Sequence, residues 1–259
     1  MRENLSTMEV LRWQLDAGVD ETIGDEPLNH FAAPPQPEAS AGLAKPPVKV
    51  KASASAENIL HDACAAAANA GTIEELKAAV AGFDGCALKK TATNLVFGDG
   101  NPKAKIVLIG EGPGAEEDRQ GVPFVGPSGL LLDKMLASIG LDRDSVYISN
   151  TVFWRPPGNR TPTSGETALC LPFVERLMEL IDPEILITLG GPAAKAMLAE
   201  TAGIGRLRGK WYTYSTPKLS RPVQATALFH PAYLLRSPDH KREAWHDLLM
   251  IRDKLDQVS

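Results

Sequence analysis

From about residue 57 onward, short continuous apolar runs alternate with longer segments whose apolar residues recur at helical spacing. The short runs are rich in β-branched residues, which is typical of strands buried on both faces, and they lie at 105–109, 146–149, 185–189 and 224–229. The longer segments predict helices at 57–70, 73–82, 128–139, 164–181, 192–198 and 238–255. Thr72 and Thr163 are each followed three residues later by glutamate, which is the spacing of a capping box. A further run at 211–214 predicts an edge strand.

Strands that alternate with helices predict an α/β fold, a three-layer α/β/α sandwich around a central, mainly parallel four-stranded sheet. The carboxyl ends of parallel strands meet at one edge of the sheet, where open α/β sheets bind ligands. Glu111, Asn150 and His230 each follow the end of a predicted strand. We therefore expect these three side chains to come together, although they are far apart in the chain.

The first 55 residues differ in composition from the rest of the chain. Within residues 1–23, apolar side chains at helical spacing predict a short N-terminal helix. Residues 24–55 are rich in Pro, Ala, Ser and Lys and bury too little apolar surface to offset the entropy of ordering, so we expect a flexible linker. A single α/β domain is then expected over 56–259.

Composition narrows the class of protein. With 44% hydrophobic and 23% charged residues, the chain is typical of soluble globular proteins. No apolar run approaches the roughly 20 residues that cross a membrane, so we expect no membrane partner. Three cysteines without a regular spacing, Cys64, Cys86 and Cys170, favour a reducing compartment, and we predict a cytoplasmic protein that acts as a monomer.

The formal net charge of -5 conceals an uneven distribution. Residues 1–60 hold nine acidic and five basic side chains, whereas residues 200–245 hold eight basic and three acidic ones. A chain that is acidic overall can therefore still present a basic face to a polyanion such as nucleic acid. Basic stretches are also common on solvated surfaces, so both interpretations stay open here.

The strand at 105–109 leads into GEGPGAEED, a glycine turn followed by clustered carboxylates. The spacing Gly110-x-Gly112-x-x-Ala115 loosely matches the dinucleotide-binding fingerprint. That interpretation is disfavoured, because Glu111 inside the turn and the acids after it would repel a phosphate. Carboxylates that only cap a helix would account for 116–118 but not for a glutamate between glycines.

Three blocks in this order resemble family 4 uracil-DNA glycosylases, namely GEGPGAEEDRQGVPFVGPSG, RPPGNRTPT and HPAYLLR. The resemblance covers roughly residues 84–255. It implies a DNA repair enzyme whose partner is uracil-containing DNA. Such an enzyme flips uracil out of the helix and hydrolyses its N-glycosidic bond, leaving an abasic site.

The same resemblance implies catalytic roles for three residues. Cleavage of the bond develops positive charge on the sugar and negative charge on uracil, so a carboxylate and a hydrogen-bond donor at these two places stabilise the transition state. Glu111 matches the carboxylate and His230 matches the donor to the departing base. Asn150 is expected to be a further catalytic or water-holding residue.

The matched blocks also imply residues that bind the base and the DNA. Phe124 would stack on the flipped base, Asn159 would pair with its polar edge, and Glu117 would fill the space that the methyl group of thymine needs. The implied uracil-binding residues are Gly112, Gly114, Glu117, Phe124 and Asn159. Leu234 would enter the gap left by the base, and three arginines would contact phosphates. The implied DNA-binding residues are Arg155, Arg160, Tyr233, Leu234 and Arg236.

The resemblance breaks at the cofactor. Family 4 enzymes hold a [4Fe–4S] cluster on four cysteines, and the matching places in this chain are Phe83, Cys86, Trp154 and Cys170. Two thiolates cannot complete a cluster that takes four, and no His or Asp replaces the other two. We therefore predict that the chain binds no cofactor and no metal, and that apolar packing takes the place of the cluster.

Two alternatives concern the fate of the bound DNA. A non-catalytic protein that binds uracil-containing or abasic DNA would keep the same pocket, although Glu111 and His230 argue against it. A related group of enzymes traps the abasic product through a histidine in an inserted basic loop. No such insert with a histidine lies between Phe124 and Asn159, so covalent trapping is not expected.

Overall fold

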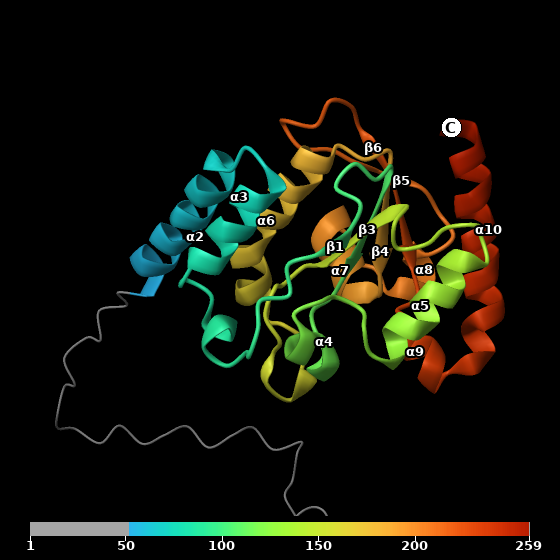
Figure 1. The fold of residues 1–259 in the computed structure, drawn as a ribbon, viewed down its shortest axis with the longest axis horizontal. Helices are drawn as coiled ribbons and strands as arrows, with labels where there is room; N and C mark the ends of the chain where they lie inside the picture. The colour runs from blue at the N-terminus through green and yellow to red at the C-terminus, as the bar shows by residue number, and fades with distance from the viewer. Residues whose placement is uncertain (1–51, 259) are drawn as a thin grey trace, which may run out of the picture. The chain divides into compact units, whose positions relative to one another are not determined.

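The computed structural model describes residues 52–258 (Figure 1). Its α-helices are α2 (Ala52–Asn69), α3 (Ile73–Gly82), α4 (Ala115–Gln120), α5 (Pro127–Ala137), α6 (Ser164–Ile181), α7 (Gly191–Leu198), α8 (Ile204–Leu207), α9 (Pro231–Arg236) and α10 (Lys241–Val258). Its strands are β1 (Asp99–Gly100), β2 (Ile106–Gly110), β3 (Val146–Asn150), β4 (Ile185–Leu189), β5 (Tyr212–Tyr214) and β6 (Val223–Leu228). Short 3-10 helices are η1 (Ala87–Lys90), η2 (Pro157–Asn159) and η3 (Pro238–His240).

The strands form one sheet in the order β1-β3-β2-β4-β6-β5. The inner four, β3, β2, β4 and β6, run parallel, whereas β1 and β5 pair antiparallel with the outer members of that set. The mainly parallel α/β sheet is thus confirmed, but it has six strands rather than the predicted four. The additional strands are the two edges: β5 corresponds to the edge strand expected at 211–214, whereas β1 has only two residues, too few to produce a recognisable hydrophobic pattern.

Helices cover the two faces of the sheet, because successive side chains of a strand point to opposite faces. Val107 and Ile109 of β2 belong to one buried cluster together with residues of α2, α3 and α6, while Ile106 and Leu108 belong to another with residues of α5, α9 and α10. Figure 1 shows the same division, with α2, α3 and α6 on one side of the sheet and α5, α9 and α10 on the other. Each of these β2 side chains is almost fully buried, which contributes about 1.5–3 kcal/mol apiece.

Several helix boundaries follow from local signals. Thr163 accepts a hydrogen bond from Glu166 N, and the Glu166 carboxylate accepts one from Thr163 N, so the predicted capping box of α6 is complete. Thr72 likewise accepts from Glu75 N at the start of α3.

Other boundaries differ from the prediction. The helix expected over 238–255 begins as η3, and α10 continues to Val258. The six-residue helices α4 and α9 were not predicted, because six residues give too few turns to show a periodic pattern. The predicted helix within 1–23 and most of the predicted linker lie outside the described residues, and α2 begins at Ala52, inside the range predicted as linker. In residues 52–258 no helix has the length and apolar character needed to cross a membrane.

Candidate active site

A cavity of about 530 Å³ opens at the carboxyl edge of the parallel strands. Strand register creates this edge, because Gly110 at the end of β2 pairs with Asn150 at the end of β3, and Leu189 of β4 pairs with Leu228 of β6. Glu111, Asn150 and His230 all line the cavity, as the order of the strands requires. Figure 1 shows α4, the yellow loop around 156–162 and α9 at this end of the sheet, and residues of all these segments or of the turns beside them line the cavity.

His230 lies between β6 and α9 and is the N-cap residue of α9. Its Nδ1 accepts a hydrogen bond of 3.1 Å from Ala232 N, so the ring proton of the neutral imidazole is on Nε2. Burial, with a smaller contribution from the Arg236 cation, lowers the pKa of His230 to about 4. At neutral pH this side chain is therefore an uncharged donor, and within the described residues its Nε2 has no hydrogen-bond partner.

Phe124 provides an aromatic wall beside this imidazole. Its side chain is buried, and its ring centroid lies 5.6 Å from that of His230, with 30° between the planes. The two rings are already in contact, so no other planar group fits between them. Gly110 permits this arrangement, since a Cβ there would lie 2.7 Å from Phe124 Cζ and 2.4 Å from Asn150 Oδ1.

Asn150 lines the cavity and carries an unsatisfied side-chain oxygen. The residue is 1% exposed, and its buried Oδ1 has no hydrogen-bond partner among the described residues. An acceptor left in this state costs about 1–3 kcal/mol unless a ligand or water supplies a donor. Asn159 differs, because it is exposed in the loop and its Oδ1 already accepts from Arg155 Nε at 2.7 Å.

Glu117, in α4, is buried and uses its carboxylate within the protein. Its two oxygens accept hydrogen bonds from the backbone N–H groups of Gly114, Val125 and Gly126 at 3.1, 3.0 and 2.9 Å. The carboxylate therefore joins the glycine turn to the turn that carries Phe124, and it lines the cavity. Because it occupies the amides that a bound phosphate would need, the structure also argues against the dinucleotide alternative.

Glu111 reaches the cavity from the glycine turn, and its backbone is held by a residue that the sequence did not single out. Thr151 Oγ1 donates to Glu111 O at 2.6 Å, and Thr151 N donates to Gly110 O at 2.9 Å. Gly112 also lines the cavity, and a Cβ there would lie 2.8 Å from Val152 Cγ2. The turn is therefore attached to the segment that follows β3.

The predicted DNA-binding residues fall into different environments. Tyr233, Arg160 and Arg236 line the cavity. Arg160 is already paired with both oxygens of Glu166, at 2.8 and 2.7 Å, and this pairing lowers the pKa of the Glu166 carboxyl to about 2. Arg236 is exposed on α9 and shows no such pair in the described part of the chain, so its charge is the most available at the rim.

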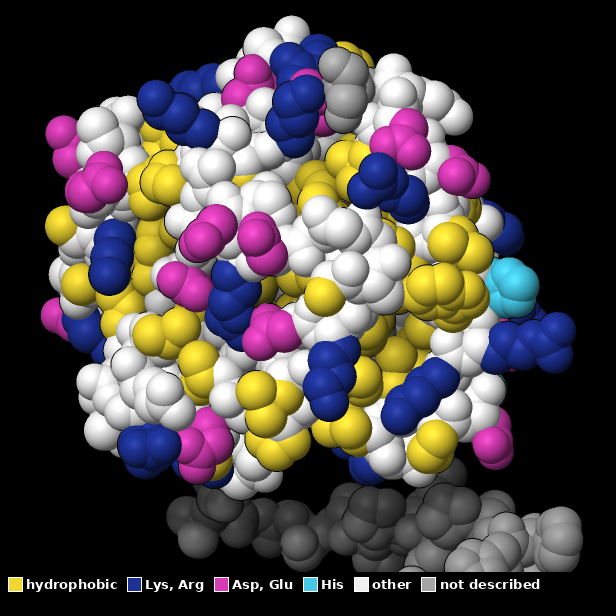
Figure 2. Space-filling model, turned by 45° about the vertical axis from the view of Figure 1, so that its right-hand side comes forward, with side chains coloured by type: hydrophobic (Ala, Val, Ile, Leu, Met, Phe, Trp, Pro, Cys, Tyr) yellow, Lys and Arg dark blue, Asp and Glu magenta, His cyan; other side chains and the backbone are white. Residues whose placement is uncertain are grey.

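The prediction for Leu234 is wrong in this structure. Its side chain is 1% exposed and packs in the buried cluster under α5, α9 and α10, so it is not free to enter a duplex. The next residue, Leu235, is 44% exposed, and Leu130 at the start of α5 is 62% exposed. Figure 2, which brings the α5, α9 and α10 side forward, shows hydrophobic side chains exposed among lysines and arginines on this face.

The basic stretch at 200–245 does not form a continuous free surface. Arg208 donates to both oxygens of the buried Asp247 carboxylate at 2.8 Å and stacks over the Phe229 ring, 5.2 Å from its centroid. Arg221 lies within 4 Å of carboxylates of Asp182 and Glu184. Part of the positive charge counted in the sequence is thus neutralised inside the protein.

Comparison with known proteins gives the family of this chain. Residues 97–249, more than half of the chain, match the family model of the uracil DNA glycosylase superfamily. The chain belongs to this superfamily. The type-4 uracil-DNA glycosylase of Archaeoglobus fulgidus is 43% identical over 170 residues, which cover 64% of this chain and 84% of that protein. The type-4 uracil-DNA glycosylase of Sulfurisphaera tokodaii is 37% identical over 187 residues, covering 70% and 84%.

A third relative is a larger protein than this chain. A DNA polymerase of Bacillus phage SP01 is 31% identical over 170 residues, which cover 65% of this chain but 18% of the polymerase. The similarity is therefore confined to a small part of that polymerase.

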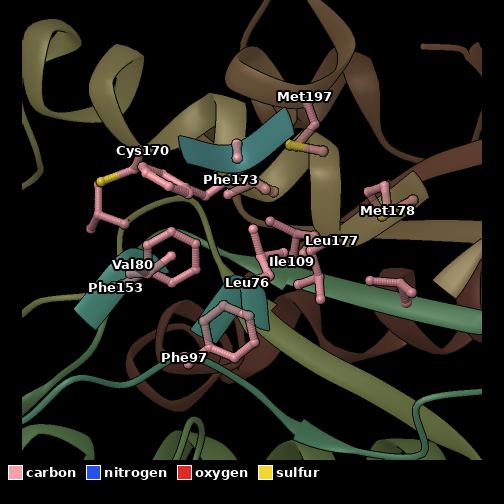
Figure 3. Packing of buried hydrophobic residues seen from close by; sticks show 14 of the residues in the cluster. Leu76, Val80, Phe97, Ile109, Phe153, Cys170, Phe173, Leu177, Met178 and Met197 are labelled. Carbon is pink, nitrogen blue, oxygen red and sulfur yellow. The ribbon is translucent and has the colours of Figure 1, made fainter. Parts of the chain in front are cut away.

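The places where family 4 members carry cluster cysteines do not fit an iron–sulfur cluster here. Phe83 packs on Phe173 with ring centroids 5.3 Å apart, and Trp154 packs on Phe153 at 6.3 Å. These four rings and the thiols of Cys86 and Cys170 belong to one buried cluster, and we call the six side chains together the aromatic cluster. Figure 3 shows Cys170 beside Phe153 and Phe173 in this packing. Over residues 52–258, no group of three or more His, Cys, Asp or Glu side chains is arranged to hold a metal ion.

The two thiols of the aromatic cluster interact with each other. A hydrogen bond between them lowers the pKa of Cys86 and raises that of Cys170, and burial raises both. Both residues are fully buried. Their surroundings are those of a packed core with two thiols in contact, which supplies half of the ligands that a [4Fe–4S] cluster requires.

Proposed function

We propose that this protein is a uracil-DNA glycosylase that flips uracil out of DNA and hydrolyses the bond between uracil N1 and deoxyribose C1′, leaving an abasic site. The observation that carries the proposal is the grouping of a carboxylate, an uncharged imidazole donor and an unsatisfied amide acceptor around one cavity. Membership of the superfamily and the similarity to type-4 uracil-DNA glycosylases support the same function and a role in DNA repair.

Recognition of the base is assigned to Phe124 and Asn150. The Phe124 ring offers an aromatic surface for stacking, as pockets for flipped bases do. Uracil presents an N3–H donor between two carbonyl acceptors, and the buried Asn150 Oδ1 is the acceptor that lacks such a donor. This favours Asn150 over Asn159 as the amide that reads the base, and leaves Asn159 as a contact at the rim.

Bond cleavage is assigned to His230 and Glu111. As the bond between C1′ and N1 breaks, its electron pair moves onto uracil, and His230 Nε2–H donates a hydrogen bond to the carbonyl oxygen that gains charge. A neutral imidazole suits this task because it already carries its proton on Nε2 at neutral pH and can donate without a change of protonation state. The Glu111 carboxylate stabilises the positive sugar and orients the water whose oxygen bonds to C1′. This water passes a proton to the carboxylate as the new C–O bond forms, and the released uracil anion takes up a proton from solvent.

Selection against thymine is assigned to Glu117. Three backbone hydrogen bonds hold its carboxylate in place, so it forms a wall that does not move aside for a methyl group. Gly112 and Gly114 contribute backbone to the same side of the cavity.

Binding of uracil-containing DNA is assigned to the rim, through Arg236, Tyr233, Arg155 and, once it separates from Glu166, Arg160. Leu235 takes the wedge role that the sequence suggested for its neighbour, since it is the exposed leucine of this pair. The proposal also includes action as a cytoplasmic monomer without a cofactor.

A single uracil in a labelled duplex tests the function. After incubation with the protein, abasic sites are cleaved with alkali and the strands are separated by size. Strand breaks that depend on uracil and are lost with Glu111→Ala support the enzyme. If the protein binds the uracil-containing duplex but produces no strand breaks, the result would support the non-catalytic alternative and overturn the proposed activity.

The cofactor is tested separately. Protein purified without oxygen is expected to be colourless and free of iron, and a brown, iron-containing preparation would overturn this part of the proposal. The double variant Phe83→Cys with Trp154→Cys returns thiols to all four matched places and serves as the positive control.

A further inference from the structure

Arg143 lies in the loop before β3, outside the cavity, and its guanidinium donates four hydrogen bonds. It donates to the backbone oxygens of Phe124 and Pro123, the latter at 3.2 Å. It also pairs with Asp133 of α5 at 2.9 Å and with Asp99 of β1 at 3.2 Å. Arg143 therefore joins α5 and β1 to the turn that carries the aromatic wall.

This turn is held from two sides by opposite charges. The carbonyls of Pro123 and Phe124 face the Arg143 cation, and the N–H groups of Val125 and Gly126 face the Glu117 carboxylate. Charge-assisted hydrogen bonds are stronger than neutral ones and confine the direction of the groups they join. The planar guanidinium fork can bond two adjacent carbonyls, which a lysine cannot do with the same geometry.

The backbone at Phe124 requires such support. Its φ of 54° lies in the left-handed region, which a bulky residue rarely adopts and which persists only where the surroundings impose it. On the other side, a Cβ at Gly129 would lie 1.7 Å from Phe124 O, so α5 approaches this carbonyl as closely as a glycine allows. The direction of the Phe124 ring is thus determined by contacts on its backbone.

We propose that Arg143 is a positioning residue for base excision, which acts through Phe124. By holding the Phe124 carbonyl it sets the ring beside His230, where the flipped base must stack within reach of the imidazole donor. The inference rests on the proposed glycosylase function and extends it to a residue that contacts neither the cavity nor the DNA.

A kinetic double-mutant cycle tests this role, with single-turnover rates of uracil release measured at saturating duplex. Arg143→Met is expected to lower the rate about 10- to 100-fold, because small displacements of positioning groups cost this much. Affinity for a uracil-free duplex should be unchanged. In a Phe124→Ala background, the same substitution is expected to cause no further loss of rate, since the group through which Arg143 acts is gone.

Two further variants separate positioning from stability. Arg252→Met is the matched control, because Arg252 also donates to a backbone carbonyl, Ile139 O at 2.8 Å, and pairs with an aspartate, Asp256, away from the cavity. It should lower the melting temperature without changing the rate. Arg143→Lys keeps the charge near Asp99 and Asp133 and secures a folded protein, and it should still lose rate only when Phe124 is present.

The outcomes that would overturn the inference are distinct from those that would overturn the function. If the wild-type protein releases no uracil, the function itself fails. If the wild-type protein is active but Arg143→Lys and Arg143→Met retain its full rate, or lose as much rate without Phe124 as with it, the glycosylase stands and the positioning role of Arg143 is wrong.

Discussion

The cavity and the aromatic cluster both lie where this chain resembles family 4 enzymes, yet they differ in what their buried groups do. At the cavity, polar groups lack hydrogen-bond partners among the described residues, as with the buried Asn150 Oδ1 and the Nε2 of the half-buried His230. At the aromatic cluster, Phe83 and Trp154 are packed ring against ring, and Cys86 and Cys170 contact each other. The cavity therefore leaves hydrogen-bonding groups free for a ligand, whereas the side chains of the aromatic cluster pack on one another.

This difference indicates that one of the two regions can change while the other keeps its role. Apolar packing can hold elements of the fold together in place of a bound cluster, because this requires only buried contact of the right volume. The groups at the cavity have no such substitute, because stabilising charge on a departing base depends on a donor at one defined point. Variants in the two regions should therefore fail in different measurements.

The largest effect is expected at the aromatic cluster. Trp154→Ala should lower the free energy of unfolding by about 3–5 kcal/mol, since it removes a large buried ring and leaves a cavity. Urea unfolding measures this, with Trp154→Phe as the control that retains a ring. The rate per folded molecule should be unchanged, and a loss of rate without a loss of stability would contradict the distinction between the two regions.

The next largest effect is expected at His230. His230→Asn keeps an acceptor for Ala232 N at the start of α9 but loses the Nε2 donor. The single-turnover rate should fall about 100- to 1,000-fold, as it does when one donor to a developing anion is removed. The melting temperature should stay close to that of the wild type. A variant that retains its rate would show that His230 is structural.

A smaller effect separates the two amides. Asn150→Ala should lower the rate about 100-fold, while the free energy of unfolding stays constant or rises, because the variant removes an acceptor buried without a partner. Asn159→Ala, at the exposed rim, should stay within about 10-fold of the wild type, since the pair that it breaks with Arg155 is solvent-exposed. Equal losses from the two variants would argue against Asn150 as the group that reads the base.

The smallest expected effect is a shift in the pH at which the rate declines. His230 has a folded pKa of about 4, below the value near 6.5 expected for the unfolded chain, so its contribution to stability is full above pH 6.5 and is lost as the pH falls towards 4. The rate at saturating DNA should then show no loss near pH 6.5 and should decline only towards pH 4. Arg236→Gln removes a cation that helps to lower this pKa, so the decline should move to higher pH. An unchanged profile in the variant would contradict the assigned influence of Arg236.

Much of the framework was predictable because it depends on local pattern. Continuous β-branched runs predicted the four parallel strands, and the capping spacing of Thr163 and Glu166 predicted where α6 begins. Strand order then made it predictable that Glu111, Asn150 and His230 would share an edge. The edge strand β1 and the short helices α4 and α9 could not be predicted, since elements of two to six residues carry too little periodic signal.

What the sequence alone determined was which residue types stand at the ends of the strands and which cysteines of the matched blocks are absent. Only the tertiary structure decided how each group is used. It buried Leu234 and exposed Leu235, left Asn150 without a partner, and placed Arg143 behind Phe124. The physical reason is that exposure and hydrogen bonding depend on groups far apart in the chain, Arg143 and Phe124 among them, and local spacing carries no information about which distant donors and acceptors will meet.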